Sequence, residues 1–237
     1  MAEPLTMLRR DRSTLLSSLL GKPLDVPPLP ERLDRRSEMR AEMARVGLEF
    51  EFFDAIKVQD KGMFQRLGSH GCFLGHRQLL NEAASQNSGI FIIQDDCVFI
   101  VDRVSIPDCD IFYGGFEASD PSDPHHSDII GAHCMAFSPL AARLASEYLE
   151  DYLKLGFSPD PQAAQESSYN PNVRPPIDGA MVWFRRRHPE LRTVFNKIAL
   201  QRSSRSDVTP GRFDTVPIVR VLLSMADVFE PAPYCPG

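Results

Sequence analysis

The stretch that most constrains the fold is residues 89–100, where an apolar run through Ile90–Ile93 leads into Gln94-Asp95-Asp96 and a second apolar run follows. A continuous apolar run of this length predicts a strand buried on both faces, as found inside parallel sheets. Ligands of α/β proteins usually lie at the carboxyl ends of such strands. We therefore expect a functional site at this acidic tip. The alternative is an ordinary polar turn, because Asp is a common turn residue.

The size and composition of the chain predict one soluble α/β domain. Its 237 residues are 43% hydrophobic and 24% charged, which is typical of a globular protein with a sizeable core. The net charge of −6 argues against a nucleic-acid partner. We expect a peripheral arm over residues 1–22, a single domain over residues 23–230 and a tail over residues 231–237.

Cysteine usage and hydropathy predict a cytoplasmic protein. The five cysteines are odd in number and form no Cys-x-x-Cys pair, which is typical of reduced thiols. No apolar run approaches the ~20 residues needed to cross a bilayer. Arginines precede an apolar stretch at residues 15–20, but that stretch is short and lacks a cleavage site. We expect a cytoplasmic location, with at most a peripheral contact at the inner face of the membrane.

Helical and extended patterns alternate along the chain, which predicts a three-layer α/β domain with a mixed, mainly parallel central sheet. The expected helices cover residues 32–46 with Asp34 as N-cap, 72–85, 139–155 after Ser138-Pro139, 177–188 and 216–229. The expected strands cover residues 48–55, 89–100, 109–113, 129–137 and 193–200.

A series of short motifs stands in a recognisable order along these elements. The series consists of Asp34-Arg35-Arg36, Phe53-Asp54-Ala55, Gly71-Cys72 with Gly75-His76, Gln94-Asp95-Asp96, Gly131-Ala132-His133 and Pro176-Ile177-Asp178. It resembles the glycosyltransferase family 25 domain, known from bacterial lipopolysaccharide and lipooligosaccharide β-galactosyltransferases and from collagen galactosyltransferases. The resemblance covers roughly residues 28–210, and the ordered set is more specific than any single motif.

The resemblance implies a GT-A-like fold and an inverting hexosyltransferase. The donor would be a nucleotide sugar, a UDP-hexose such as UDP-galactose or UDP-glucose. The acceptor would be a glycan or glycolipid of a cell-surface polysaccharide or lipopolysaccharide. The cofactor would be Mn²⁺ or Mg²⁺, which prefer oxygen ligands.

We assign roles to individual residues on this basis. Asp96 is the first expected metal ligand, with Asp95 as a second ligand or a partner of a donor hydroxyl. Asp178 is the expected general base, because a well-fixed carboxylate suits that task. The residues expected to contact the donor are Arg35, Asp54, Ala55, Gly71, His76 and Asp95.

Three departures from the family pattern leave other functions open. Gln94 stands where an acid is usual, and Gly75 stands where a hydroxyl residue is usual. The proline-rich residues 24–29 replace the usual first apolar strand. A catalytically weakened or inactive nucleotide- or glycan-binding relative is therefore the first alternative. A metal-dependent hydrolase built from Asp95, Asp96 and the histidines is the second.

Several of these side chains also have an ordinary structural interpretation. Asp178 would then cap a helix, and His76 and His133 would be hydrogen-bonded core histidines. Arg36 would pair with an acid on a solvated helix face. Trp183 is expected in the core.

Two charged clusters, one of histidines and one of arginines, also have an ordinary structural interpretation. His125-His126 is expected in a solvated loop. The arginines at 185–187 would suit an anionic acceptor or lipid headgroup, or would only add surface solubility.

Overall fold

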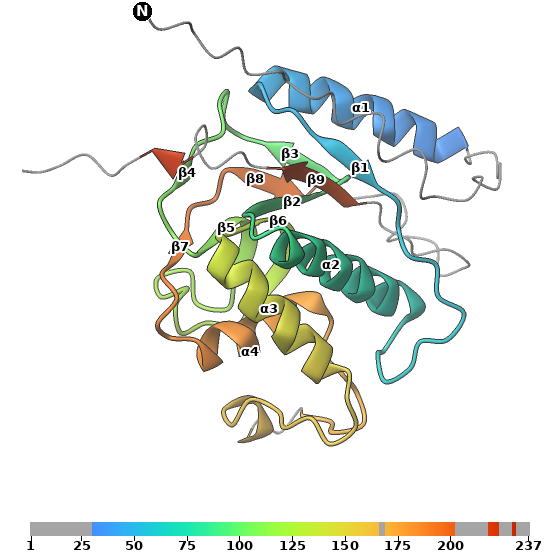
Figure 1. The fold of residues 1–237 in the computed structure, drawn as a ribbon, viewed down its shortest axis with the longest axis vertical. Coiled ribbons are helices and arrows are strands. Elements are labelled where there is room, and N and C mark those ends of the chain that lie inside the picture. Colours follow the sequence, from blue (N-terminus) through green and yellow to red (C-terminus); the bar gives the residue numbers. More distant parts are fainter. Residues whose placement is uncertain (1–29, 166–168, 202–217, 223–228, 231–237) are drawn as a thin grey trace, which may run out of the picture. The chain divides into compact units, whose positions relative to one another are not determined.

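The computed structural model describes residues 30–165, 169–201, 218–222 and 229–230 (Figure 1). The chain divides into two compact units, Met1–Asp34 and Arg35–Gly237. Only the start of the first helix is described in the first unit, and every site discussed below belongs to the second. The arm and the tail expected at the two ends lie outside the described residues.

A six-stranded mixed sheet forms the centre of the second unit, with strand order β1-β9-β2-β6-β5-β7. Only β5 and β7 pair in parallel, and the other four neighbouring pairs are antiparallel. The strands are β1 (Glu51–Phe53), β2 (Ile90–Gln94), β5 (Ile111–Ala118), β6 (Ile129–Phe137), β7 (Thr193–Phe195) and β9 (Ile218–Leu222). The prediction of a mainly parallel sheet was therefore wrong.

The cause of this error lies in what a buried run of apolar residues can indicate. All five residues of β2 are buried, as predicted. However, β2 has antiparallel neighbours on both sides, β9 and β6. A central strand covered on both faces is apolar throughout whichever way its neighbours run. The pattern thus predicts burial and not strand direction.

Apolar clusters cover both faces of the sheet. One contains residues of α2 (Leu67–Ser85), α3 (Pro139–Tyr152) and α4 (Ile177–Arg187) together with Ile90 and Ile92 of β2. The other contains residues of α1 (Pro30–Val46), β3 (Cys97–Phe99) and β8 (Ala199–Gln201) together with Phe91 and Ile93. This alternation along β2 follows from the two-residue period of a strand, and it confirms a layered α/β arrangement.

The helix ends follow local rules at most positions. Ser138 caps α3, because its Oγ accepts a hydrogen bond from the Ala141 backbone N–H at 3.2 Å, and Pro139 follows it as predicted. Gly47, with φ +72°, follows the last residue of α1. That helix begins at Pro30, however, so Asp34 lies inside it and is not its N-cap.

The carboxyl-terminal part differs most from the prediction. A helix was expected over residues 216–229, but the described residues of that range form the strands β9 and β10 (Phe229–Glu230). β10 pairs with β4 (Ile106–Pro107). The single strand expected over residues 193–200 is divided into β7 and β8. Further back in the chain, a short 3₁₀ helix covers Ala163–Gln165.

No helix within the described ranges is long and apolar enough to cross a bilayer. Four of the cysteines are described, Cys72, Cys97, Cys109 and Cys134, and all four are free thiols.

Candidate functional site

The acidic turn after β2 presents one carboxylate with unused hydrogen-bonding capacity. Gln94 and Asp95 are buried, whereas Asp96 is half-buried. Asp96 Oδ2 accepts a hydrogen bond from Gln201 Nε2 of β8 at 2.8 Å. Asp96 Oδ1 is buried without a partner among the described residues. A buried oxygen left unsatisfied costs free energy, so the turn suits a cation or a donor group at Oδ1.

Cys72 of α2 lies close to this turn. Gln94 donates from Nε2 to Cys72 Sγ at 3.8 Å, so its amide is directed toward the helix. Burial raises the pKa of Cys72 to about 12, and the negative charges of Asp178 and Asp96 add to the shift. Both carboxylates are therefore near enough to act on one thiol, although they lie 82 residues apart in the sequence.

His76 lies one turn further along α2 and is almost fully buried. Its Nδ1 donates to the Cys72 carbonyl at 3.0 Å. Burial lowers the pKa of His76, while the carbonyls of Cys72 and Ala132 and the Asp178 charge oppose that shift. His76 is thus a neutral core histidine near the acidic groups.

Asp178 fixes the start of α4 to the start of β6. Its Oδ2 accepts from the Gly131 backbone N–H at 3.2 Å, and its Oδ1 accepts from the Gly179 N–H at 3.2 Å. The N-cap of α4 is Pro176, so the interpretation of Asp178 as the cap is wrong. A carboxylate offers about four acceptor positions, so two remain for a substrate proton.

His133 on β6 occupies a slot formed by two glycines. A Cβ at Gly115 would lie 2.2 Å from its Nε2, and one at Gly131 would lie 3.0 Å from its Nδ1. The ring is buried. Burial lowers the pKa of His133, whereas the charge of Asp96 and the backbone of Ala199 act in the opposite direction. His133 is therefore a core histidine, as expected.

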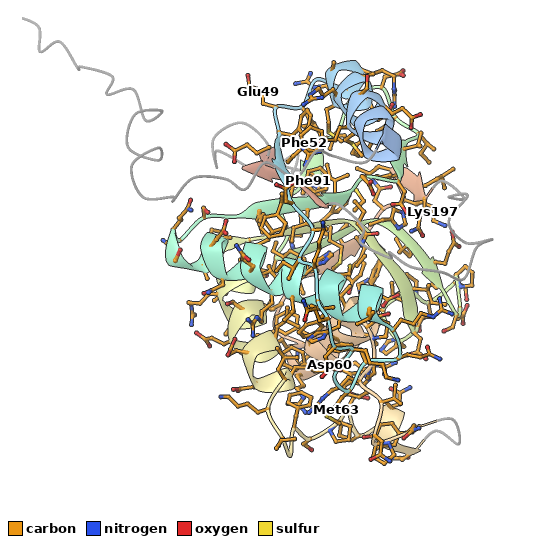
Figure 2. All side chains as sticks on the ribbon, turned by 90° about the vertical axis from the view of Figure 1, so that its right-hand side faces the viewer. Glu49, Phe52, Asp60, Met63, Phe91 and Lys197 are labelled. Carbon is orange, nitrogen blue, oxygen red and sulfur yellow. The ribbon has the colours of Figure 1, made fainter. Side chains whose placement is uncertain are left out.

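The residues of α1 and β1 near the expected donor contacts form an ion pair and a packing contact with each other. Arg36 pairs with Asp54, whose side chain is otherwise exposed. The Arg36 guanidinium also lies 4.8 Å from the centre of the ring of Phe52, a residue labelled in Figure 2. The side chain of Arg35 is outside the described residues.

Gly71 and Ala55 belong to a close contact between α2 and the segment after β1. A Cβ on Gly71 would lie 2.6 Å from the Ile56 carbonyl oxygen, next to the half-buried Ala55. The packing alone requires a glycine here. The geometry therefore gives Gly71 a structural role.

The arginines of α4 hold loops together. Arg185 is buried and donates to the carbonyls of Pro124 at 2.9 Å and Ser127 at 2.9 Å. Arg186 pairs with Asp128 at 2.9 Å and Asp160 at 3.3 Å. Arg187 bonds to the Ser158 carbonyl. This corrects the expectation of a solvated basic patch.

The loop with His125 and His126 was expected to be solvated, and His126 is exposed and paired only with Asp123. Trp183 is largely buried, as expected. Sequence reasoning missed Gln201 and the Gly131 N–H, which hold Asp96 and Asp178. No local pattern could have found them, because both partners are distant in the sequence.

The described residues contain no group of three or more His, Cys, Asp or Glu side chains arranged to hold a metal ion. A cation at Asp96 would therefore take further ligands from a substrate or water. The buried, unsatisfied Oδ1 of Asp96 is compatible with this role.

Comparisons with family models, curated proteins and solved structures found no match.

Proposed function

We propose that the chain is a metal-dependent, inverting glycosyltransferase that moves a hexose, galactose or glucose, from a UDP-sugar to a glycan acceptor. The observation that carries the proposal is the buried, unsatisfied Oδ1 of Asp96 in the turn after β2, with Asp178 near enough for its charge to act on the same thiol, Cys72. Asp96 keeps an unused buried oxygen, and Asp178 keeps free acceptor positions. A pair of carboxylates with separate duties is what glycosyl transfer from a diphosphate donor requires.

A GT-A-like domain is the fold proposed with this function. Apolar clusters cover both faces of the sheet, and β1, β2, β5 and β7 run in the same direction. The acidic turn follows one of these four strands, at its carboxyl end. These features support the proposal, and they agree with the ordered motifs that resemble family 25.

The mechanism assigns separate roles to the two acids. Asp96, with Asp95 beside it, would hold Mn²⁺ or Mg²⁺, which would neutralise the diphosphate of the donor. Asp178 would accept the proton of the acceptor hydroxyl as its oxygen bonds to the anomeric carbon and the bond to the diphosphate breaks. The two N–H donors on Asp178 would hold it in position for this transfer. Attack opposite the leaving group would invert the anomeric centre.

Calorimetry with UDP and Mn²⁺ tests the metal site, together with a turnover assay on UDP-galactose and UDP-glucose. The unaltered protein should bind UDP only when Mn²⁺ is present, and Asp96→Asn should abolish that binding. Asp102→Asn is the matched control, because Asp102 is exposed and paired only with Arg45. If UDP does not bind, or if Asp96→Asn binds it as well as the control does, the proposal fails.

Gln94 favours a second candidate, a non-catalytic relative that binds the nucleotide or the glycan. Its amide is directed to Cys72 and supplies no negative charge where the family pattern has an acid. This candidate predicts Mn²⁺-dependent UDP binding without hexose transfer to any glycan acceptor. Transfer to an acceptor would exclude it.

A further inference from the structure

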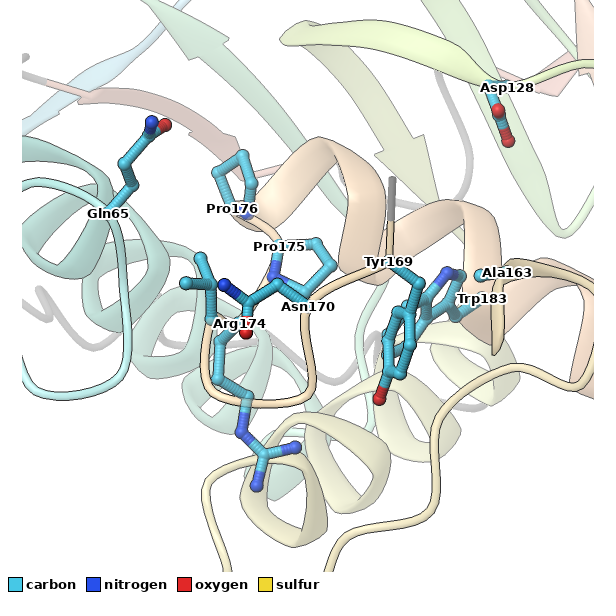
Figure 3. A pocket seen from close by; sticks show the side chains of 10 residues that line it. Gln65, Asp128, Ala163, Tyr169, Asn170, Arg174, Pro175, Pro176 and Trp183 are labelled. Carbon is cyan, nitrogen blue, oxygen red and sulfur yellow. The ribbon is translucent and has the colours of Figure 1, made fainter. Parts of the chain in front are cut away.

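A cavity of about 290 Å³ lies beside the amino-terminal half of α4 (Figure 3). Its size is at the lower end of the ~300–1,000 Å³ common for small-molecule sites. Ten residues line it: Gln65, Asp128, Ala163, Tyr169, Asn170, Val173, Arg174, Pro175, Pro176 and Trp183. None of them was expected to form a binding site.

The lining combines aromatic rings with neutral hydrogen-bonding groups. Tyr169 is half-buried, and Trp183 contributes the small part of its surface that is not covered. Gln65 and Asn170 are exposed amides. Asn170 Oδ1 accepts a hydrogen bond from the Asn172 backbone N–H, and the Asn170 amino group takes no part in that bond. Aromatic faces pack against the C–H faces of a pyranose, and amides bond its hydroxyls.

The charges of the lining argue against a phosphate ligand. The one lining cation, Arg174, donates to the Lys154 carbonyl at 2.7 Å and lies over the rings of Tyr152 and Phe157. Figure 3 shows its guanidinium pointing away from Pro175 and Pro176. The remaining lining charge is the carboxylate of Asp128, whose Oδ1 pairs with Arg186 at 2.9 Å and whose Oδ2 can accept from a hydroxyl. The chemistry fits a neutral saccharide.

The cavity is joined through the backbone to the elements of the acidic site. Gln65 lies two residues before the start of α2, which carries Cys72 and His76. Pro175 and Pro176 lead directly into Asp178. At the other end, Asp128 precedes β6, which supplies the Gly131 N–H to Asp178. A chain bound in the cavity would therefore lie beside the proposed base.

We propose that this cavity binds a neutral saccharide and is the acceptor subsite of the enzyme. The assignment as acceptor subsite rests on the proposed function, whereas saccharide binding rests on the cavity alone. Tyr169 is the specificity-determining residue, because its ring stands in the cavity wall and is not fully covered by the core.

The single tryptophan of the chain makes the proposal testable, because Trp183 lines the cavity and is the only indole in the fluorescence signal. Its fluorescence is followed while lactose or methyl β-D-glucopyranoside is added into the millimolar range. The unaltered protein should show a saturable change with at least one of the two sugars. Tyr169→Ala should weaken that binding at least tenfold, and Tyr169→Phe should retain it. Leu155→Ala is the control for an exposed side chain outside the cavity. Thermal unfolding of each variant checks the fold.

Calorimetry with UDP and Mn²⁺ on the same samples separates the two claims. Both the subsite and the proposed function are supported if Tyr169→Ala weakens saccharide binding but retains UDP binding. No response to either sugar, with UDP bound, overturns the subsite and leaves the proposed function. Saccharide binding without UDP binding overturns the proposed function and supports the saccharide site. Displacement of the sugar by inorganic phosphate, or equal sugar binding by Tyr169→Ala and the unaltered protein, overturns the site.

Discussion

The two ends of α4 use their charges in opposite ways. At the carboxyl end, Arg185 and Arg186 donate to carbonyls or carboxylates of neighbouring loops. At the amino end, Asp178 receives two backbone N–H bonds and keeps acceptor positions unused. At the carboxyl end, the arginine donors are used to hold loops. At the amino end, Asp178 still has acceptor positions for a ligand. A cluster of charges in a sequence is therefore weaker evidence for a site than one incompletely satisfied acid.

Asp178→Asn gives the largest expected effect on function. The amide keeps the shape of the side chain but cannot take the acceptor proton, so turnover should fall by about 10²–10⁴-fold, the usual contribution of a general base. The amide has one oxygen, so one of the two backbone N–H groups loses its acceptor and the melting temperature should fall modestly. The measurement is kcat with a glycan acceptor, with Asp151→Asn on the exposed side of α3 as control. Equal turnover by both variants would exclude Asp178 as the base.

Arg185→Met gives the largest expected effect on stability. The change leaves the carbonyls of Pro124 and Ser127 without their donor, and each buried group left unsatisfied costs ~1–3 kcal/mol. Urea unfolding should show a loss of roughly 3 kcal/mol in the free energy of unfolding. Arg143→Met, at an exposed ion pair, should cost less than ~1 kcal/mol. Similar losses in the two variants would contradict the anchoring role.

Gln94→Glu adds a charge beside Cys72, the thiol on which Asp178 of α4 also acts. The variant therefore tests whether the acidic end of this comparison binds a ligand. A second acid beside Asp96 should tighten Mn²⁺ binding several-fold, because metal affinity grows with ligand charge. The carboxylate would be buried near Cys72, so some stability should be lost. Calorimetric titration with Mn²⁺ measures the first effect. Unchanged or weaker affinity would count against a cation at this turn.

The pH dependence of stability gives the smallest expected effect. The pKa of His76 is lowered by burial, so below about 6.5 the unfolded chain takes up a proton that the folded chain resists. The contribution of His76 is complete above pH 6.5 and is lost as the pH falls toward its folded pKa. The melting temperature should fall between pH 7.5 and 5.5, and less steeply in His76→Gln. Equal slopes would show that His76 does not contribute.

Local signals predicted much of the fold. The buried run of β2, the Ser138-Pro139 start of α3 and the Gly47 end of α1 each depend on residues close in the sequence. Strand direction around β2 depends on partners more than 40 residues away, and the C-terminal strands depend on partners more than 120 residues away. The alternating β-branched residues of β9 were assigned to a helix, because a short apolar run fits both periods.

The site was predicted in part for the same reason. Asp96 and Asp178 were identified from the ends of the elements that carry them, and each keeps capacity for a ligand. Gly71 was assigned to the donor, whereas its contact with the Ile56 carbonyl explains a glycine there by packing. The cavity lining comes from five separate stretches of chain, so no motif could indicate it.

The position of β9 has a consequence for the order of assembly. Its residues, Ile218–Leu222, lie between β1 and β2, although they follow β2 by more than 120 residues in the sequence. During synthesis one backbone edge of β2 therefore stays without its partner until nearly the whole chain has emerged. Contacts of such long separation slow folding, and an open strand edge invites pairing between chains. Full-length synthesis closes this edge, and chains that stop before β9 should aggregate through it.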